Sequence, residues 1–184
     1  MGGEADLDLD ITHVVQPLDR SMLAALHEVV SSATTALENY EHARALEITE
    51  SFFWTFCDDY LELVKERAYN REGNWSDQAS ASARAALAIA IDTFVRLLAP
   101  YLPFVTEEVW SWYREGSVHQ AAWPTASDLE VTPDGTVEGA IEDASSVLLG
   151  VASEALVVLR RVKSEAKVSP CLLYTSDAAD EGLG

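Results

Sequence analysis

The stretch "FFWTFCDDYLELVKERAYN", residues 52–70, decides the fold class of this chain. Its apolar side chains recur at intervals of three and four residues, at Phe53, Phe56, Tyr60 and Val64. This spacing places them on one face of an α-helix, with the charged residues between them on the opposite face. The stretch therefore predicts an amphipathic helix that packs against a core.

The predicted helix extends well beyond the quoted stretch. The same spacing starts at His42 and meets no proline or glycine before Asn70, which predicts a helix of about 45 Å. Asp19 is the expected N-cap of a preceding helix, and Asp92 with Arg96 is an expected surface ion pair on a following one. In all, similar spacing indicates four further helices, over residues 19–38, 79–99, 103–114 and 137–167. Since no strand-like alternation of useful length occurs, we predict an all-α helical bundle of about five helices.

Composition limits the class of protein. The chain has 184 residues, of which 48% are apolar and 23% charged, enough for one core of ordinary size. No apolar run approaches the roughly 20 residues of a membrane span, and the first residues do not form an export signal. The two cysteines, Cys57 and Cys171, fit neither a disulfide framework nor metal-ligand spacing. We expect a cytoplasmic protein that does not contact membranes.

The net charge of the chain argues against nucleic-acid binding, whereas the distribution of its basic residues allows local binding. The formal net charge of −19 repels phosphate at long range and argues against a protein that coats nucleic acid. Basic residues nevertheless gather in two places, Lys65, Arg67 and Arg71 in the first, and Arg160, Arg161, Lys163 and Lys167 in the second. Local patches of this kind can still meet a phosphate backbone.

The sequence contains no recognisable motif of a catalytic or metal site. A di-metal carboxylate bundle needs Glu-x-x-His on two helices, and Asp10 with His13 is only a near miss outside the predicted helices. There is also no glycine-rich phosphate loop and no G-x-S-x-G motif. We therefore expect no catalytic residue, no metal ligand and no cofactor site in this chain.

Four segments together resemble one enzyme family. The segment "FFWTFCDDYLELVKERAY" is similar to the helix of valine-tRNA ligases written F-W-x-x-F-C-D-x-Y-L-E-x-x-K. "LAPYLPFVTEEVWSW", residues 98–112, resembles the L-A-P-x-x-P-F-x-T-E-E-x-W segment common to the valine, isoleucine and leucine enzymes of class I. "PLDRSMLAAL" and "SVHQAAWP" resemble further family segments in the right order, and the likeness covers about residues 11–169.

The resemblance implies a helical anticodon-binding domain of the class I type. In that family the domain grips the anticodon arm of tRNA, while a separate catalytic domain uses ATP and Mg²⁺ to activate valine and join it to tRNA. The expected partners are therefore a valine-specific tRNA and the catalytic domain of the parent chain. The family's catalytic signatures H-I-G-H and K-M-S-K-S do not occur here, so this chain is not expected to aminoacylate by itself.

A second departure from the family concerns the beginning of the bundle. The family places a helix of the form F-x-N-K-x-x-N-A-x-R-F before "PLDR", and this chain lacks it. We expect a bundle that is incomplete at its N-terminal side and exposes apolar surface. The expected organisation is an extended lead-in over 1–17, the anticodon-binding bundle over 18–169, and a disordered tail over 170–184 that looks like translated linker sequence.

Within this frame, four residues are candidate RNA contacts. Lys65, Arg67 and Arg71 are placed to reach backbone phosphate, and Trp54 is a candidate platform for a stacked base. The alternatives are solvated charges at a helix end and an aromatic side chain at the edge of the core. The competing functional interpretation is a helical protein–protein interaction module that binds no RNA.

Overall fold

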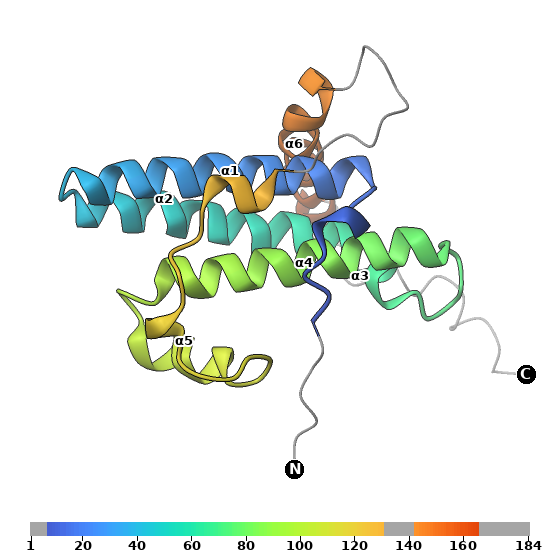
Figure 1. Ribbon diagram of the computed structural model, residues 1–184. Coiled ribbons are helices and arrows are strands. Elements are labelled where there is room, and N and C mark those ends of the chain that lie inside the picture. The colour runs from blue at the N-terminus through green and yellow to red at the C-terminus, as the bar shows by residue number, and fades with distance from the viewer. Residues whose placement is uncertain (1–6, 131–141, 166–184) are drawn as a thin grey trace, which may run out of the picture. The chain divides into compact units, whose positions relative to one another are not determined.

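The computed structural model describes residues 7–130 and 142–165, leaving out the side chains of 142–146 and of Lys163. The described part consists of helices joined by turns and loops and contains no strand (Figure 1). Its longer elements are α1 (Pro17–Glu38), α2 (His42–Thr55), η2 (Phe56–Tyr60), α3 (Leu61–Tyr69), α4 (Asp77–Leu98), α5 (Pro103–Trp110) and α6 (Glu142–Glu165). Short 3-10 turns are η1 (Ile11–His13), η3 (Val118–Gln120) and η4 (Ala126–Leu129). The all-α prediction is confirmed.

The chain divides into two compact units, with the boundary in the sequence between Leu149 and Gly150. In the first unit, α1 packs along α2, and α4 lies against both of them and against α3 (Figure 1). The core between these helices is built from the apolar faces that the three-and-four spacing predicts. Its fully buried side chains include Met22, Leu23, Leu26, Val30, Tyr60, Val64 and Leu97.

The quoted stretch lies at the centre of this core. Its helix continues from His42 to Tyr69 as α2, η2 and α3, with a single π-helical stretch at Phe56–Tyr60. Phe56, Tyr60 and Val64 are buried as predicted. Phe56 packs against the ring of Phe94 from α4, with the ring centroids 5.2 Å apart. This contact joins the long helix to the alanine-rich helix α4.

The start of α1 differs from the prediction. Pro17 is the first helical residue and Gln16 takes the N-cap position, without a side-chain hydrogen bond to the helix. Asp19 is fully buried inside the first turn and is not the N-cap. The backbone N–H groups of Val15 and Gln16 donate to the Ser82 hydroxyl on α4 at 3.1 and 3.0 Å. The end of the expected lead-in is therefore attached to the bundle.

The expected surface pair on α4 also lies deeper than predicted. Asp92 is only 4% exposed, and its carboxylate binds Arg96 on the same helix at 2.8 Å. It also accepts a hydrogen bond from Arg114 Nη2 at 3.1 Å. Arg114 follows α5, which ends at Trp110, four residues before the predicted end. Asp92 is thus a buried link between α4 and the chain beyond α5.

The last helix confirms the fifth predicted element. The spacing predicts it over 137–167, and α6 covers Glu142–Glu165. The second unit, from Gly150 onward, carries Arg161, whose Nε donates to Glu165 at 3.0 Å along the exposed helix surface. The predicted tail at 170–184, with Cys171, lies outside the described residues and stays a prediction.

Candidate nucleic-acid interface

The end of α3 and the loop that follows it carry the basic residues singled out above. Arg71 is exposed, and its guanidinium lies over the ring of Tyr69 at 5.0 Å from the ring centroid. Tyr69 is itself largely exposed. A cation over an aromatic face is held by the charge distribution of the ring. This contact keeps Arg71 at the surface beside a flat apolar platform.

The loop after α3 is closed by one asparagine. Asn70 adopts the left-handed conformation with φ of 45°, which ends α3. Its side chain spans the loop, since the Trp75 N–H donates to Asn70 Oδ1 at 3.0 Å and Asn70 Nδ2 donates to the Trp75 carbonyl at 2.9 Å. The indole of Trp75 remains about half exposed. The loop therefore presents two aromatic side chains, Tyr69 and Trp75, on either side of Arg71 in sequence.

Arg67 does not take part in this surface. Its residue is only 6% exposed, and its guanidinium is held inside the bundle by the carboxylate of Asp19. Arg67 Nη1 also donates to the Ala79 carbonyl at the start of α4, at 3.0 Å. The position of Arg67 on the buried stripe, three residues after Val64, explains this orientation. The structure thus separates Arg67 from Lys65 and Arg71, with which it was grouped as a phosphate contact.

The Asp19 carboxylate is the centre of a buried polar cluster. Besides Arg67, it accepts hydrogen bonds from the Tyr60 hydroxyl at 2.8 Å and the Ser82 hydroxyl at 2.6 Å. Burial and the neighbouring Asp19 charge raise the pKa of Tyr60 above its ordinary value, which keeps the phenol protonated. The cluster joins α1, η2, α3 and α4, and the bond from Arg67 to the Ala79 carbonyl holds the end of α3 to the start of α4, between which the loop runs.

The two remaining candidates have acidic neighbours. Lys65 is partly exposed and binds Glu62, one turn before it, at 2.9 Å. Trp54 is about half exposed, with its ring edge-on to Phe53, and it lines a shallow hollow that also contains Glu47 and Glu50. Because two carboxylates border that hollow, a phosphate backbone is repelled there. Of the two, Lys65 is the one that lies beside the Arg71 loop in the chain.

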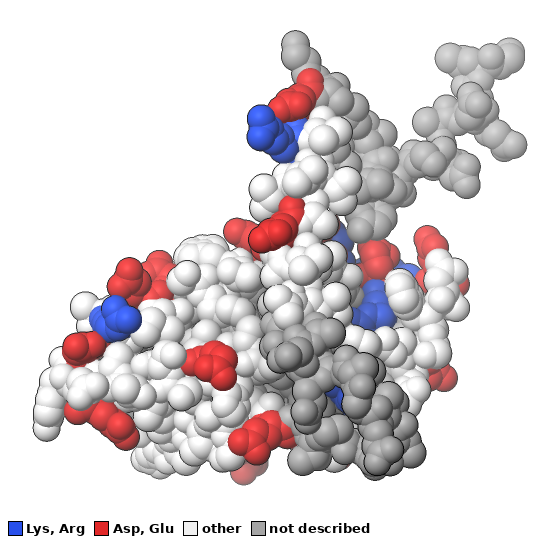
Figure 2. All heavy atoms as spheres, turned by 90° about the horizontal axis from the view of Figure 1, so that it is seen from above, with Lys and Arg blue, Asp and Glu red and all other residues white. Residues whose placement is uncertain are grey.

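The charge of this end differs from that of the rest of the chain. Residues 61–84 hold four basic and four acidic side chains, in a chain whose formal net charge is −19. On the face drawn in Figure 2, carboxylates recur over the surface, and the basic side chains form small separate groups among them. The end of α3 is thus one of the less acidic parts of the molecule.

Other kinds of site find no support in the described residues. There, no three His, Cys, Asp or Glu side chains gather as a metal site. Nor does any described helix combine the length and apolar character needed to cross a membrane. The exposed aromatic and basic side chains after α3 remain the best-formed candidate site in the described ranges.

Comparison with known proteins identifies the family of this chain. The family described as "Anticodon-binding domain of tRNA ligase" matches residues 19–172. A valine-tRNA ligase of Salinispora tropica is 57% identical over 166 residues, which cover 86% of this chain and 19% of that protein. The chain belongs to the valine-tRNA ligase family, as its anticodon-binding domain.

Further valine-tRNA ligases show the same partial coverage. The enzyme of Thermobifida fusca is 52% identical over 89% of this chain and 17% of its own length. The enzyme of Bifidobacterium longum subsp. infantis is 50% identical over 100% of this chain and 20% of its own length. The chain therefore spans about a fifth of the valine-tRNA ligases it matches, and the resemblance in the sequence is confirmed.

Proposed function

We propose that the loop after α3 is where this anticodon-binding domain touches RNA, with Tyr69 and Trp75 as stacking platforms and Arg71 as a phosphate contact. Unpaired bases of an RNA loop stack on aromatic side chains, at about 1–3 kcal/mol per base. The observation that carries the proposal is the Arg71 guanidinium over the exposed Tyr69 ring. Lys65 is a secondary phosphate contact in this proposal, and Trp54 is a secondary platform for a base, away from the phosphates. Arg67 is bound inside the bundle and is not proposed to contact RNA.

The proposed role of the domain is to hold the anticodon arm of a valine tRNA. The attachment of valine itself is assigned to the remainder of the parent enzyme, which in this proposal uses ATP and Mg²⁺. The domain contributes by binding the tRNA, so it affects how tightly tRNA is held more than how fast valine is activated. The catalytic part of the parent chain and the valine tRNA are therefore the proposed partners.

The proposal is tested with two tRNA transcripts and the full-length parent enzyme. Valine anticodons share A in the middle and C in the third position, so one transcript carries these bases and the other has both changed. We expect tighter binding of the first, and a steep loss of affinity with added salt because part of the contact is to phosphate. Equal affinity would show that the two anticodon bases are not read, whereas binding of neither transcript would favour a protein–protein interaction module.

A further inference from the structure

A further basic side chain reaches the end of α3 from a neighbouring helix. Arg84 lies on α4 and is exposed. Its Nη1 donates to the Ala68 carbonyl at 3.2 Å, one residue before Tyr69. That carbonyl belongs to the last turn of α3, where carbonyl groups lack a partner within the helix. The bond therefore holds the Arg84 guanidinium close to the start of the loop that carries Arg71.

The four basic residues of 61–84 differ in whether a carboxylate neutralises them. The two with a carboxylate partner are Lys65, which binds Glu62, and Arg67, which binds Asp19. Among the described residues, no ion pair forms on either Arg71 or Arg84. In a chain with a formal net charge of −19, these two exposed guanidinium groups can therefore meet an anion from outside.

The local sequence explains why these two arginines are unpaired. On α4, the positions three and four residues before and after Arg84 hold serine, leucine and two alanines. These are the positions from which a carboxylate on the same helix could reach it. Glu72, which follows Arg71, instead accepts a hydrogen bond from Asn74 Nδ2 at 2.9 Å. Neither arginine thus has a carboxylate partner from its own segment.

A guanidinium group held in this way suits a phosphate. It carries five N–H donors in a planar fork, which matches two phosphate oxygens at once. Arg84 donates to the Ala68 carbonyl, which fixes the position of the group without neutralising its charge. A side chain that is held in place before binding loses less conformational entropy when it binds.

We propose that Arg84 is a second phosphate contact for the anticodon arm. A base within an RNA strand is flanked by two phosphates, so a base stacked on Tyr69 brings a phosphate to each side of that ring. The Arg71 guanidinium lies over the ring, and Arg84 is bonded to the residue before it. In this assignment Arg71 binds the phosphate on one side of the stacked base, and Arg84 binds the phosphate on the other. The inference rests on the proposed function of the loop after α3 and adds a residue of α4 to it.

The test measures how binding of the valine transcript by the full-length parent enzyme depends on salt. Each phosphate contact to a single strand contributes about 0.7 to the slope of log affinity against log salt concentration. Arg84→Gln should therefore make the slope shallower by about 0.7, and Arg71→Gln should have the same effect. Arg84→Lys keeps the positive charge and should keep the slope of the unchanged enzyme.

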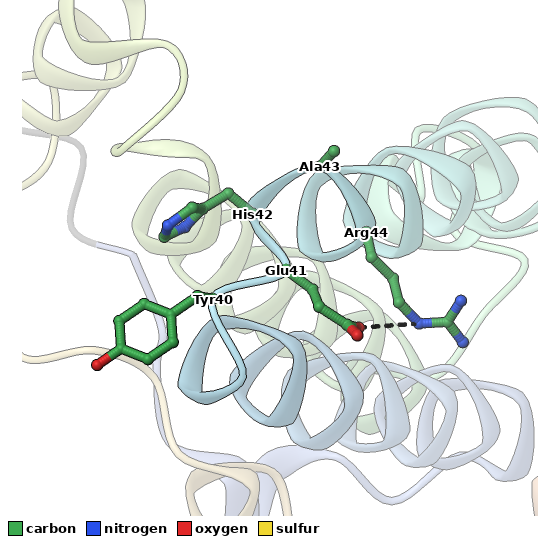
Figure 3. Close-up of a pocket in the computed structure, with 5 residues that line it drawn as sticks. All are labelled: Tyr40, Glu41, His42, Ala43 and Arg44. Atoms are coloured by element: carbon green, nitrogen blue, oxygen red, sulfur yellow. Dashed lines mark ion pairs between the residues drawn. The ribbon is translucent and has the colours of Figure 1, made fainter.

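Arg44→Gln is the matched control, because it removes the same charge from an arginine that has a carboxylate partner. Figure 3 shows Arg44 at the turn between α1 and α2, with its side chain directed toward Glu41. The two charged groups are 3.8 Å apart. This variant should leave the slope unchanged. A change as large as that of Arg84→Gln would show that the slope follows net charge alone, which would overturn the proposal.

Three further results would also overturn it. An unchanged slope in Arg84→Gln, with a shallower slope in Arg71→Gln, would leave Arg84 as a cap of α3 while the proposed function stands. A shallower slope in both Arg84→Gln and Arg84→Lys would assign the effect to altered packing at the end of α3. An unchanged slope in both Arg71→Gln and Arg84→Gln would contradict the proposed function of the loop together with this inference.

Discussion

Among single residues, Asp19 connects more of the fold than any other residue of the buried polar cluster. Its carboxylate is fully buried and accepts hydrogen bonds from Tyr60, Arg67 and Ser82. A buried ion pair is costly to form, but removing one partner leaves an uncompensated charge inside the protein. The cluster therefore links α1, η2, α3 and α4 at one buried point.

Replacing Asp19 tests this cluster. Asp19→Ala should lower the free energy of unfolding by about 3–5 kcal/mol, because Arg67 is then left buried without its counter-ion. The double change Asp19→Leu with Arg67→Met should cost less than the single one, since no charge remains unpaired. Urea denaturation of the three proteins measures both values. A double variant less stable than Asp19→Ala would contradict the account.

Tyr60 predicts a response to alkaline pH. Burial, and then the Asp19 charge, raise the pKa of its phenol in the folded protein, whereas the unfolded chain keeps an ordinary value of about 10. The stabilisation is present below pH of about 10 and is lost as pH rises further, because only the unfolded state then releases the proton. Each proton that is released on unfolding changes the slope of the free energy of unfolding against pH by about 1.4 kcal/mol per pH unit. Tyr60→Phe should therefore flatten the alkaline fall in stability, and an unchanged slope would contradict this assignment.

Among the elements, the long helix through α2, η2 and α3 carries the most testable packing. Phe56→Ala should destabilise the chain by about 3–5 kcal/mol, because its ring is buried against Phe94. Glu62→Ala should change stability by less than about 0.5 kcal/mol, since Glu62 is exposed. Thermal or urea unfolding of the two variants checks the helical phase. Similar effects at both positions would show that the phase is incorrect.

The helices were predictable because each one repeats its apolar side chains at three and four residues. The internal ion pair of Asp19 with Arg67 was not predicted, although both residues lie on these apolar helix faces. Arg67 follows Val64 by three residues, and Asp19 precedes Met22 by three, so each charge stands on a face otherwise buried. Two opposite charges on two buried stripes are a signal for an internal ion pair, but only the packed structure shows that the stripes meet at these residues.

The loop after α3 was harder to predict, because its geometry depends on contacts between side chain and backbone. Trp75 and Tyr69 were not among the predicted contacts, although both flank Arg71 in the sequence. The two hydrogen bonds between the Asn70 side chain and the Trp75 backbone set the shape of the loop, and hydrophobic periodicity does not report such bonds. The signal available in the sequence was Asn70 next to Arg71, with the aromatic residues Tyr69 and Trp75 on either side of them.

At the scale of the whole molecule, the strong negative charge makes local placement decisive. With a formal net charge of −19, the chain does not attract RNA through its overall field. The proposed binding therefore depends on short-range contacts at a less acidic end, where the loop after α3 offers an exposed cation beside aromatic side chains.

The most direct test of this account is the effect of Arg71→Glu on the kinetics of the full-length parent enzyme. Arg44→Glu serves as the matched control, because it changes net charge equally at the other end of the unit (Figure 1). Arg71→Glu should raise KM for tRNA roughly tenfold, or about 1.4 kcal/mol, while ATP-dependent valine activation stays unchanged. Arg44→Glu should change neither value appreciably. An unchanged KM for tRNA in the Arg71 variant would contradict the assignment of the RNA contact to the loop after α3.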